Sequence, residues 1–427
     1  MGILDELRWR GLLQEFTEGT DKLLENEKVT FYLGIDPTAD SMHVGHLATV
    51  ILVKHLQEQG HKPIIVIGGA TAMVGDPSGR DEERPLLTVE TIAKNQEGLR
   101  KQVAKFLDFD QNKPNGAIMV NNYDWTKDYT FLEFIRDIGK HISVNYMLSK
   151  ESVKKRLEKG ISFTEFTYQL LQGFDFYYLY KEFNCKLQVG GSDQWGNITT
   201  GTELIRRKLG SEEKAYGLVI PLITKSDGRK FGKTESGAVW LDPEKTSPYE
   251  FYQFWINTSD DDAEKYIKIF TFLSKEEIEK LIQEHREAPH RRILQKTLAE
   301  EMTKIVHGEE NLEKAIAASQ ILFGKGTKDL LASLDEKTFL SVFKGVPTFE
   351  VEKAKIEQGI NIVDLLSEAG VFKSKGEVRR LMKDNGLSIN QEKRNNPEDT
   401  ITASDLLNDK YILVRKGKKN YSLITVK

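Results

Sequence analysis

Cysteine is nearly absent from this chain of 427 residues, and long apolar runs are absent altogether. The single cysteine, Cys185, excludes an intramolecular disulfide and argues against a cysteine-based zinc site. The longest stretch without a charged side chain, residues 63–75, is shorter than the roughly 20 apolar residues that a membrane helix needs. No basic segment followed by an apolar run opens the sequence, so we expect no signal peptide. These absences predict a cytoplasmic protein with no membrane partner.

Charge is balanced overall but unevenly distributed. Acidic residues outnumber basic ones by 65 to 61, whereas from Thr348 onward 15 basic residues stand against 12 acidic ones. From Lys410 to the end there are six basic residues and no acidic one. A basic end on an acidic body suits a polyanionic partner. A positively charged face that is only solvated suits the pattern equally well, so charge alone leaves the partner open.

Apolar segments alternate with helical patterns over the first half of the chain. We expect a helix over residues 1–25 and another over residues 43–59. Expected strands are residues 29–35, 63–69, 117–121, 186–190 and 216–223. Near-continuous apolar strands separated by helices predict an α/β fold with a Rossmann-like parallel sheet covered on both faces. Such sheets bind ligands at the carboxyl ends of their strands.

The pattern changes after Trp255. An all-helical region is expected over residues 248–323, followed by a connector at 324–347. A short helix is then expected from Ile360, a second over residues 376–383, and a β-rich end. This half therefore predicts an all-helical domain and a small α+β domain.

The first candidate site lies where a strand ends, a turn follows and a helix begins, at residues 34–46. His43 and His46 are three residues apart and share one helix face, where the helix dipole and free N–H groups favour an anion. Gly45 lets a flat or bulky group approach the backbone. One interpretation is ATP, with adenine over Gly45 and phosphates near the imidazoles; incidental histidines are another. A zinc site lacks ligands.

A second glycine-rich segment follows the strand at 63–69. It matches neither G-x-G-x-x-G nor a Walker A loop. Asp76 could accept hydrogen bonds from a ligand ammonium, with Arg80 and Arg84 reaching phosphates. The alternative is a plain turn at residues 76–79.

A third glycine-rich strand end lies at residues 188–195. Here Asp193 could bind ribose hydroxyls and Gln194 could donate to a carboxylate or phosphate, unless the segment is only a loop.

Two further segments carry polar groups suited to binding. Tyr168, Gln172 and Asp175 lie at i, i+4 and i+7, so one helix face presents all three, although a wet surface gives the same pattern. Residues 230–234, Lys-Phe-Gly-Lys-Thr, follow the last expected parallel strand. Two lysines and a hydroxyl on such a loop suit a mobile clamp on a leaving pyrophosphate, but charged loops are common.

Taken in order, these segments resemble the bacterial-type tyrosyl-tRNA synthetases, a family of class I aminoacyl-tRNA synthetases. Residues 43–46 and 230–234 resemble the two class signatures, and residues 34–38, 75–79 and 190–195 resemble the tyrosine branch. The resemblance covers nearly the full chain. It implies activation of L-tyrosine with ATP to tyrosyl-adenylate and pyrophosphate, then transfer of tyrosine to the 3′ end of tRNA(Tyr).

The resemblance also implies site residues. The tyrosine-binding residues would be Tyr32 and Asp175 at the hydroxyl, with Asp76, Tyr168, Gln172 and Gln194. The ATP-binding residues would be Gly34, Asp36, Gly45, Gly191, Asp193 and Lys233. The catalytic residues would be Thr38, His43, His46, Arg80, Arg84, Lys230, Lys233 and Thr234. ATP would be a substrate that carries Mg²⁺, and no structural metal is implied.

Two positions depart from the family's pattern. Leu33 stands where some members carry a polar or thiol side chain that touches the ribose, so that contact is in doubt. Arg80 stands where some members have lysine, which replaces a mobile point charge by a planar fork.

The resemblance further implies four segments and two partners. The segments would be a catalytic domain at 1–224, a signature loop and helical anticodon-side domain at 225–325, a linker at 326–351, and an RNA-binding domain at 352–427 that resembles ribosomal protein S-four. Lys375, Arg379 and Lys383 fall on one helix face and would bind RNA, with a steep salt dependence. The family is homodimeric, and Phe163 matches an interface position, although a core aromatic fits equally well.

Three other functions compete with this interpretation. A tryptophan-specific synthetase shares the fold and both signatures, but the Tyr32 and Asp175 pair argues against it. A nucleotidyltransferase that does not act on tRNA has no use for a helical domain plus an RNA-binding end. An RNA-binding protein with an inactive site is disfavoured because both histidines and both lysines are present.

Overall fold

The computed structural model describes residues 2–78, 87–158, 160–229, 231–234, 237–321, 327–417 and 420–427. Contacts divide the chain into two compact units, one holding Met1–Asp242 and Thr258–Leu298, the other Pro243–Asn257 and Ala299–Lys427. None of the helices in the described ranges combines the length and the apolar composition needed to cross a bilayer.

The first unit contains a six-stranded sheet in the order β1-β6-β5-β2-β3-β4. The strands are β1 (Glu15–Phe16), β2 (Thr30–Ile35), β3 (Lys62–Ile67), β4 (Ile118–Asn121), β5 (Cys185–Gly191) and β6 (Tyr216–Ile220). Strand β1 pairs antiparallel at one edge, and the other neighbours are parallel. The predicted α/β fold with a parallel sheet is therefore confirmed. The last strand is shorter than expected, because it ends at Ile220 rather than residue 223.

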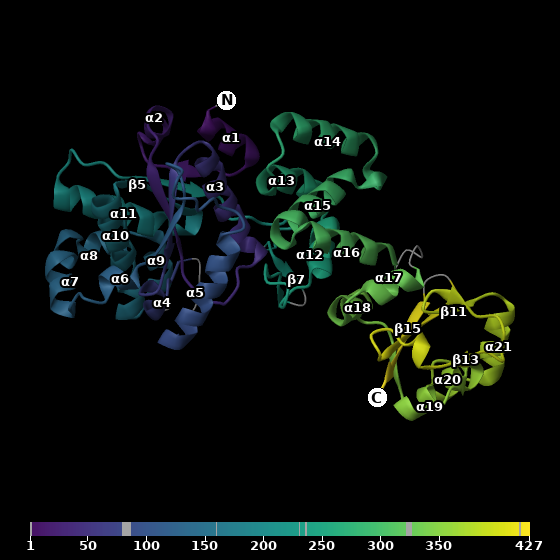
Figure 1. Cartoon of the computed structure of the whole chain (residues 1–427). Helices are drawn as coiled ribbons and strands as arrows, with labels where there is room; N and C mark the ends of the chain where they lie inside the picture. The colour runs from purple at the N-terminus through teal and green to yellow at the C-terminus, as the bar shows by residue number, and fades with distance from the viewer. Residues whose placement is uncertain are drawn as a thin grey trace. The chain divides into compact units, whose positions relative to one another are not determined.

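Helices cover both faces of this sheet (Figure 1). α3 (Leu47–Glu58) and α5 (Val89–Val103) lie on one side, and α10 (Phe163–Phe183) and α11 (Trp195–Leu209) on the other. Other elements of the unit are α1 (Ile3–Arg10), α2 (Thr20–Asn26), α4 (Thr71–Val74), α6 (Tyr123–Thr126), α7 (Phe131–Asp137), α8 (Val144–Leu148), α9 (Glu151–Leu157), β7 (Lys233–Thr234), β8 (Gly237–Ala238), α13 (Asp260–Phe270) and α14 (Lys275–Glu287).

The single helix predicted over residues 1–25 is wrong. Gly11 ends α1 with φ of 80°, and Gly19 precedes α2 with φ of 88°, a left-handed conformation that interrupts a helix. The segment between them contributes strand β1. The leucine pattern marked two short helices correctly as helical but gave no sign of the strand between them.

The sheet reverses its strand order between β2 and β5. The chain moves from β2 to β3 in one direction and from β5 to β6 in the other. Alternation along β2 sends Tyr32 toward α10, where it shares a buried cluster with Leu170 and Phe174. Ligands of open α/β sheets bind at such a switch point, at the carboxyl ends of the strands.

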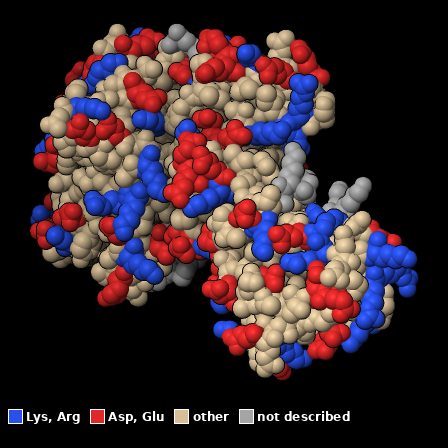
Figure 2. Space-filling model, turned by 45° about the vertical axis from the view of Figure 1, so that its right-hand side comes forward, with Lys and Arg blue, Asp and Glu red and all other residues tan. Residues whose placement is uncertain are grey.

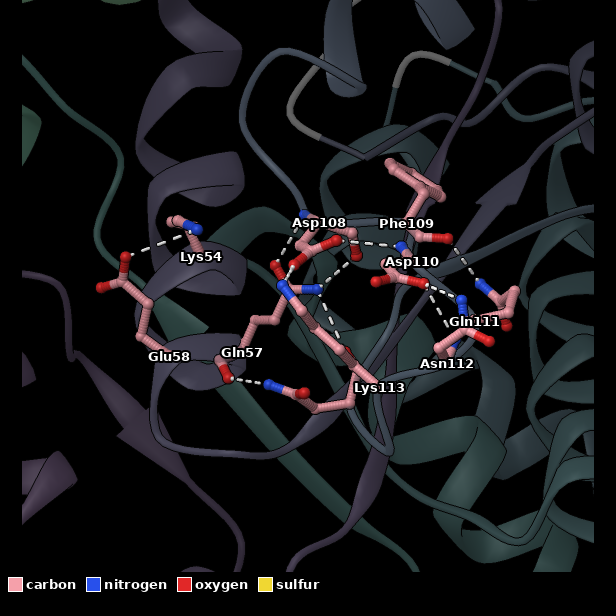
Figure 3. Close-up of polar contacts among 10 residues, drawn as sticks. Lys54, Gln57, Glu58, Asp108, Phe109, Asp110, Gln111, Asn112 and Lys113 are labelled. Atoms are coloured by element: carbon pink, nitrogen blue, oxygen red, sulfur yellow. Dashed lines mark hydrogen bonds and ion pairs between the residues drawn. The ribbon is translucent and has the colours of Figure 1, made fainter.

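The end of α3 holds the chain that leads into β4 (Figure 3). Gln57 is buried and its Nε2 donates to the carbonyl oxygens of Asp108, at 2.7 Å, and Asn115, at 3.1 Å. The Asp108 N–H in turn donates to the Gln57 Oε1 at 3.0 Å. These bonds tie α3, which begins at Leu47, to the edge of the sheet formed by β4.

The second unit combines helices with a five-stranded sheet in the order β12-β11-β14-β15-β9. Its helices include α12 (Pro248–Ile256), most of α15 (Ile293–His307), α16 (Glu309–Gln320), α17 (Lys328–Ser333), α18 (Glu336–Val342), α19 (Lys353–Glu357), α20 (Ile362–Glu368) and α21 (Lys375–Lys383). Its strands are β9 (Thr348–Val351), β10 (Ile360–Asn361), β11 (Leu387–Ile389), β12 (Glu392–Lys393), β13 (Thr400–Ile401), β14 (Tyr411–Lys416) and β15 (Asn420–Val426).

The segment expected as a connector at 324–347 is folded where it is described. It contains α17 and α18, which share a buried cluster with the last two strands. Phe339 of α18 stacks near Tyr411, with ring centroids 5.4 Å apart, and Phe343 lies 5.7 Å from Tyr421. The Glu336 carboxylate accepts a hydrogen bond from the Tyr411 hydroxyl at 2.8 Å.

Candidate active site

A cavity of about 340 Å³ opens at the carboxyl ends of β2 and β5. Its walls come from these two strands, the start of α3, helix α10 and the loops after β3, β5 and β6. The predicted site residues that line it are Tyr32, Gly34, Asp36, Thr38, His43, Gly45, His46, Asp76, Tyr168, Gln172, Asp175, Gly191, Asp193 and Gln194. Segments far apart in the sequence therefore meet at the switch point of the sheet.

The Asp175 carboxylate forms the polar end of this cavity. Its Oδ2 accepts from the Asn122 Nδ2 and its Oδ1 from the Trp125 Nε1, both at 2.9 Å. Burial raises the pKa of Asp175 to about 7, although both hydrogen bonds favour the charged form. Because the two donors fix the carboxyl plane, Asp175 is held as an acceptor for one further donor.

Tyr32 lies beside Asp175. Its side chain is 1% exposed, and its hydroxyl has no hydrogen-bond partner among the described residues. Burial, and then the Asp175 charge, raise the pKa of the Tyr32 phenol well above its ordinary value, so the phenol keeps its proton. Buried hydroxyls nearly always have a partner. An unpartnered phenol beside a carboxylate therefore suits a ligand hydroxyl.

Asp36 lines the cavity, and its carboxylate accepts hydrogen bonds from two hydroxyl groups. Its Oδ2 accepts from the Tyr168 hydroxyl at 2.8 Å and its Oδ1 from the Thr71 hydroxyl at 2.6 Å. Burial, followed by the charges of Asp36 and Asp76, raises the pKa of Tyr168 well above its ordinary value. Asp36 was predicted to bind ATP, and that stays a prediction. In the structure its carboxylate orients Tyr168 and Thr71.

A second polar cluster surrounds Asp76. The Gln194 Nε2 donates to the Asp76 Oδ2 at 2.6 Å, and the Ser78 N–H donates to the Oδ1 at 2.9 Å. The Asn197 Nδ2 donates to the Gln172 Oε1 at 3.1 Å and lies 3.4 Å from the Asp76 Oδ1. Asp76, Gln172 and Gln194, predicted separately, thus form one network that contains a buried carboxylate suited to an ammonium.

The two histidines meet at the mouth of the cavity. The helix expected from residue 43 begins only at Leu47, because Val44–His46 forms a 3-10 turn and His43 has an extended backbone. The two histidines therefore do not share one α-helix face, but their ring centroids are 4.1 Å apart. The His43 Nδ1 accepts from the Gly45 N–H at 3.0 Å, and the His46 Nδ1 accepts from the His43 N–H at 3.2 Å. Each ring therefore points its Nε2 edge away from its own backbone. Gly45 is exposed beside them.

Several predicted residues cannot be placed by their side chains. Arg80, Arg84 and Lys230 lie outside the described residues. Lys233 and Thr234 are described only by their backbone, in β7. The predicted RNA-binding residues Lys375, Arg379 and Lys383 belong to the second unit and are exposed on α21.

The residues that hydrogen-bond to the predicted ones were not predicted from the sequence: Thr71, Asn122, Trp125 and Asn197. Gln188, which also lines the cavity, was not predicted either. Gln188 lies directly across from Tyr32 in the sheet, is buried, and has an amide oxygen with no partner in the described ranges. Polar residues at the end of the strand at 117–121 could have drawn attention to Asn122. Nothing local distinguished Trp125 or Asn197.

Comparison with known proteins identifies the family. A family model described as "tRNA synthetases class I (W and Y)" matches residues 24–324, and one described as "Tyrosine--tRNA ligase SYY-like C-terminal domain" matches residues 338–424. The tyrosine--tRNA ligase of Bacteroides fragilis is 60% identical over 100% of both chains. That of Bacteroides thetaiotaomicron is 58% identical, also over 100% of both.

The chain belongs to the tyrosine--tRNA ligase family. A solved structure agrees: a C-terminally truncated mitochondrial tyrosyl-tRNA synthetase of Aspergillus nidulans superposes with a TM-score of 0.68 at 32% identity, covering 75% of this chain and 94% of that one. The first family model includes tryptophan enzymes as well as tyrosine enzymes. The C-terminal match and the full-length relatives place this chain among the tyrosine enzymes, as the sequence predicted.

Proposed function

We propose that this tyrosine--tRNA ligase forms tyrosyl-adenylate in the cavity at the ends of β2 and β5. One observation carries the assignment of the site. The Tyr32 hydroxyl is buried, has no partner among the described residues and lies beside the Asp175 carboxylate, whose other contacts are fixed. A tyrosine hydroxyl can donate to Asp175 and accept from Tyr32. A phenylalanine ring would leave both groups unpaired, which is costly in a buried site.

The remaining tyrosine contacts follow from the second network. The ammonium would lie near the carboxylate of Asp76, the hydroxyl of Tyr168 and the amide of Gln172, as the family resemblance implies. Asn197 supports this set because its amide donates to Gln172. Gln194 donates a hydrogen bond to Asp76 and would reach toward the carboxylate of the substrate tyrosine.

The activation step needs neither a general base nor a covalent enzyme intermediate. The tyrosine carboxylate is ionised at neutral pH and attacks the α-phosphorus of ATP. A new oxygen–phosphorus bond forms, the α–β phosphoanhydride bond breaks and pyrophosphate leaves. Catalysis then consists of positioning and of stabilising charge on the phosphates.

Charge on the phosphates would be met by two groups of residues. Thr38, His43 and His46 line the mouth of the cavity. The second group would be Lys230, Lys233 and Thr234 of the second signature, with Arg80 and Arg84. Mg²⁺ would arrive with ATP as part of the substrate.

The nucleotide would lie over the glycines at the mouth. Gly34 is exposed at the end of β2, and a β-carbon built on it meets no atom within 4 Å, which leaves open space for a ligand. Gly45, Gly191 and Asp193 complete this wall. Leu33 also lines the cavity but offers no hydrogen bond to a ribose.

The second unit would supply the tRNA contacts. Val378 and Met382 of α21 are buried while Lys375, Arg379 and Lys383 on the opposite side are exposed. Basic side chains gather along one edge of the C-terminal part of the chain (Figure 2). Phosphate contacts from this face would place tRNA(Tyr) for transfer of tyrosine to its 3′ end. The bounds 1–224, 225–325, 326–351 and 352–427 remain our proposal for the functional segments.

The homodimer expected for the family has a suitable surface on the first unit. Phe131 is 66% exposed, Leu132 77% and Phe163 67%, all large apolar side chains. Phe131 and Leu132 are neighbours in α7, and contiguous exposed apolar side chains mark protein–protein interfaces. We assign them to contact with a second copy of the chain. The protein would act in the cytoplasm, where its tRNA substrate occurs and where the single buried cysteine suits reducing conditions.

The decisive experiment is pyrophosphate exchange into ATP with single amino acids. We expect exchange with L-tyrosine, little with phenylalanine and none with tryptophan. Exchange with tryptophan instead would assign the pocket to the other branch of the class. Absence of exchange with every amino acid would contradict the proposed site.

A further inference from the structure

The second signature carries an aromatic residue between its two lysines, and the proposed mechanism gives that residue no role. Phe231 is 7% exposed and its ring is enclosed by two rings of α13. The centroid of Tyr266 lies 4.9 Å away, edge to face, and that of Phe270 lies 5.0 Å away, stacked. Such pairs are favoured beyond the area they bury. We call Tyr266 and Phe270 the aromatic socket.

The same helix also holds the chain that leads to the signature. The Tyr266 hydroxyl donates to the carbonyl oxygen of Thr224 at 3.2 Å. The Ser226 N–H donates to the Asp262 Oδ1 at 2.9 Å. Helix α13 therefore contacts the approach to the loop and the loop itself.

Beyond Phe231 the backbone is fitted against the first signature. Gly232 has φ of 80°, and a β-carbon built on it would lie 2.7 Å from the Val44 Cγ2 and 3.3 Å from the Gly45 nitrogen. Its carbonyl accepts from the Val239 N–H at 3.1 Å, while the Val239 carbonyl accepts from the Val44 N–H at 2.9 Å. The backbones of the two signatures are thus linked through Val239, and Gly232 packs against Val44 and Gly45.

Arg10 of α1 holds the end of helix α13 in place. Arg10 is 3% exposed, and its guanidinium donates to three carbonyl oxygens at the end of α13. They belong to Lys268 at 3.1 Å, Thr271 at 3.0 Å and Leu273 at 2.8 Å. Because charge-assisted hydrogen bonds are strong, the buried Arg10 guanidinium holds α1 against the end of α13.

We propose that Phe231 is a positioning residue: seated in the aromatic socket, it fixes the backbone of the second signature at Gly232 against Val44 and Gly45 of the first signature, and so sets the place from which Lys233 acts. This inference rests on the proposed clamp role of Lys233. Misplacing reacting groups by about 1 Å can cost roughly 100-fold in rate. Phe231 therefore acts on the rate of adenylate formation rather than on tyrosine binding, because the tyrosine contacts lie on other elements.

The test compares Phe231→Leu and Phe270→Leu with their double variant, in the full-length protein. The measurements are kcat and the ATP KM in tyrosine-dependent pyrophosphate exchange, the equilibrium Kd for tyrosine, and the melting temperature. We expect each single variant to lower kcat about 10- to 100-fold while the Kd for tyrosine changes less than about twofold. The double variant should be no slower than the slower single one, because both remove the same contact.

The matched control is Phe272→Leu, a neighbouring aromatic whose ring faces His55 at 5.3 Å. It should leave kcat unchanged. Tyr266→Phe keeps the ring and removes the hydroxyl that bonds to the Thr224 carbonyl and to Asp262, so it should show a smaller loss and serves if the leucine variants fold poorly. A lowered melting temperature with unchanged kcat, or tyrosine binding lost in parallel with kcat, would overturn the proposal.

A parallel Lys233→Ala variant distinguishes the positioning role of Phe231 from the clamp role of Lys233. If Lys233→Ala is slow and the socket variants are not, only the positioning role of Phe231 fails. If Lys233→Ala keeps full activity, the clamp assignment fails and the inference fails with it.

Discussion

At the scale of single residues, the proposed specificity for tyrosine rests on groups left incompletely paired. Asp175 receives two hydrogen bonds from Asn122 and Trp125, and the neighbouring Tyr32 hydroxyl receives none from the described residues. A buried carboxylate and a buried phenol both destabilise the ligand-free protein. The binding site therefore carries a cost in stability that the substrate hydroxyl would remove. This cost can be measured without any assay of activity.

The first prediction concerns Tyr32→Phe. Because the hydroxyl has no partner within the described ranges, its removal should leave the free energy of unfolding of the ligand-free protein unchanged or raise it by about 1 kcal/mol. The control is Tyr168→Phe, which deletes a hydroxyl bonded to Asp36 at 2.8 Å and should lower that free energy. Urea unfolding measures both. Equal losses in the two variants would mean that the Tyr32 hydroxyl is paired in solution.

The second prediction concerns the pH dependence contributed by Asp175. Its pKa is about 7 in the folded protein and about 4 when unfolded, so between these values the folded state binds more protons. The free energy of unfolding should therefore fall as pH rises from about 4 to about 7. Asp175→Asn removes this contribution. The free energy of unfolding of the variant, relative to the wild type, should therefore rise as pH increases from about 4 to about 7 and should not rise further at higher pH.

A control of opposite sign tests the same linkage. Asp335 caps α18, and its hydrogen bonds from Thr338 outweigh partial burial and lower its pKa. Its contribution is present above the unfolded pKa and is lost as pH falls through the folded value. Asp335→Asn should therefore lose stability relative to the wild type near neutral pH and approach it in acid. Urea unfolding between pH 3 and 8 distinguishes the two variants, and parallel curves would contradict the Asp175 assignment.

Residues in recognisable motifs could be predicted from the sequence, whereas their supports could not. Asp76, Tyr168 and Asp175 line one cavity, as expected for a strand end and one helix face, and Tyr32, which only the family resemblance implied, lines it too. Asn197 bonds to a residue that lies 25 positions earlier in the chain, and no spacing rule links the two. Such contacts depend on tertiary packing, which periodicity does not encode.

At the scale of elements, the parallel strands were predictable because both of their faces are buried. Strands β2 and β3 read as apolar runs for that reason. The short strand β1 was not predictable, since two residues carry no periodicity. Helix α7 shows the opposite problem: Phe131, Leu132 and Ile135 give it an apolar face that is exposed in the single chain. The proposed contact with a second copy would cover that face.

The third prediction therefore concerns α7. We expect Leu132→Asp to convert a dimer into monomers, because a charge placed in an apolar contact loses its hydration without a partner. Phe163→Asp should do the same. Leu340→Asp, an exposed leucine of the second unit, is the control and should leave the dimer intact. Sedimentation velocity at several concentrations measures the result, and a wild-type monomer at micromolar concentration would contradict the assignment.

At the scale of the whole molecule, the C-terminal strands β14 and β15 share a hydrophobic core with the helices that precede them. Leu413, Tyr421 and Leu423 share a buried cluster with Phe339 and Phe343 of the preceding segment. The sequence indicated a linker there because short helices between glycines and a proline give weak periodicity. Removing residues 352–427 would uncover the buried side of α18. A truncation would thus test the folding of the second unit as much as its binding of RNA.

The fourth prediction uses point substitutions on α21 for that reason. Arg379→Ala and Lys383→Ala remove exposed charges without touching the buried Val378 and Met382, so the fold should persist. Each lost phosphate contact should weaken tRNA(Tyr) binding and reduce the slope of log affinity against log salt by about 1. Adenylate formation needs no tRNA and should proceed at the wild-type rate. The control is Lys353→Ala, an exposed lysine on α19. If Lys353→Ala reduced the salt slope as much as the α21 variants do, the α21 residues would make no specific phosphate contacts, and net charge alone would account for tRNA binding.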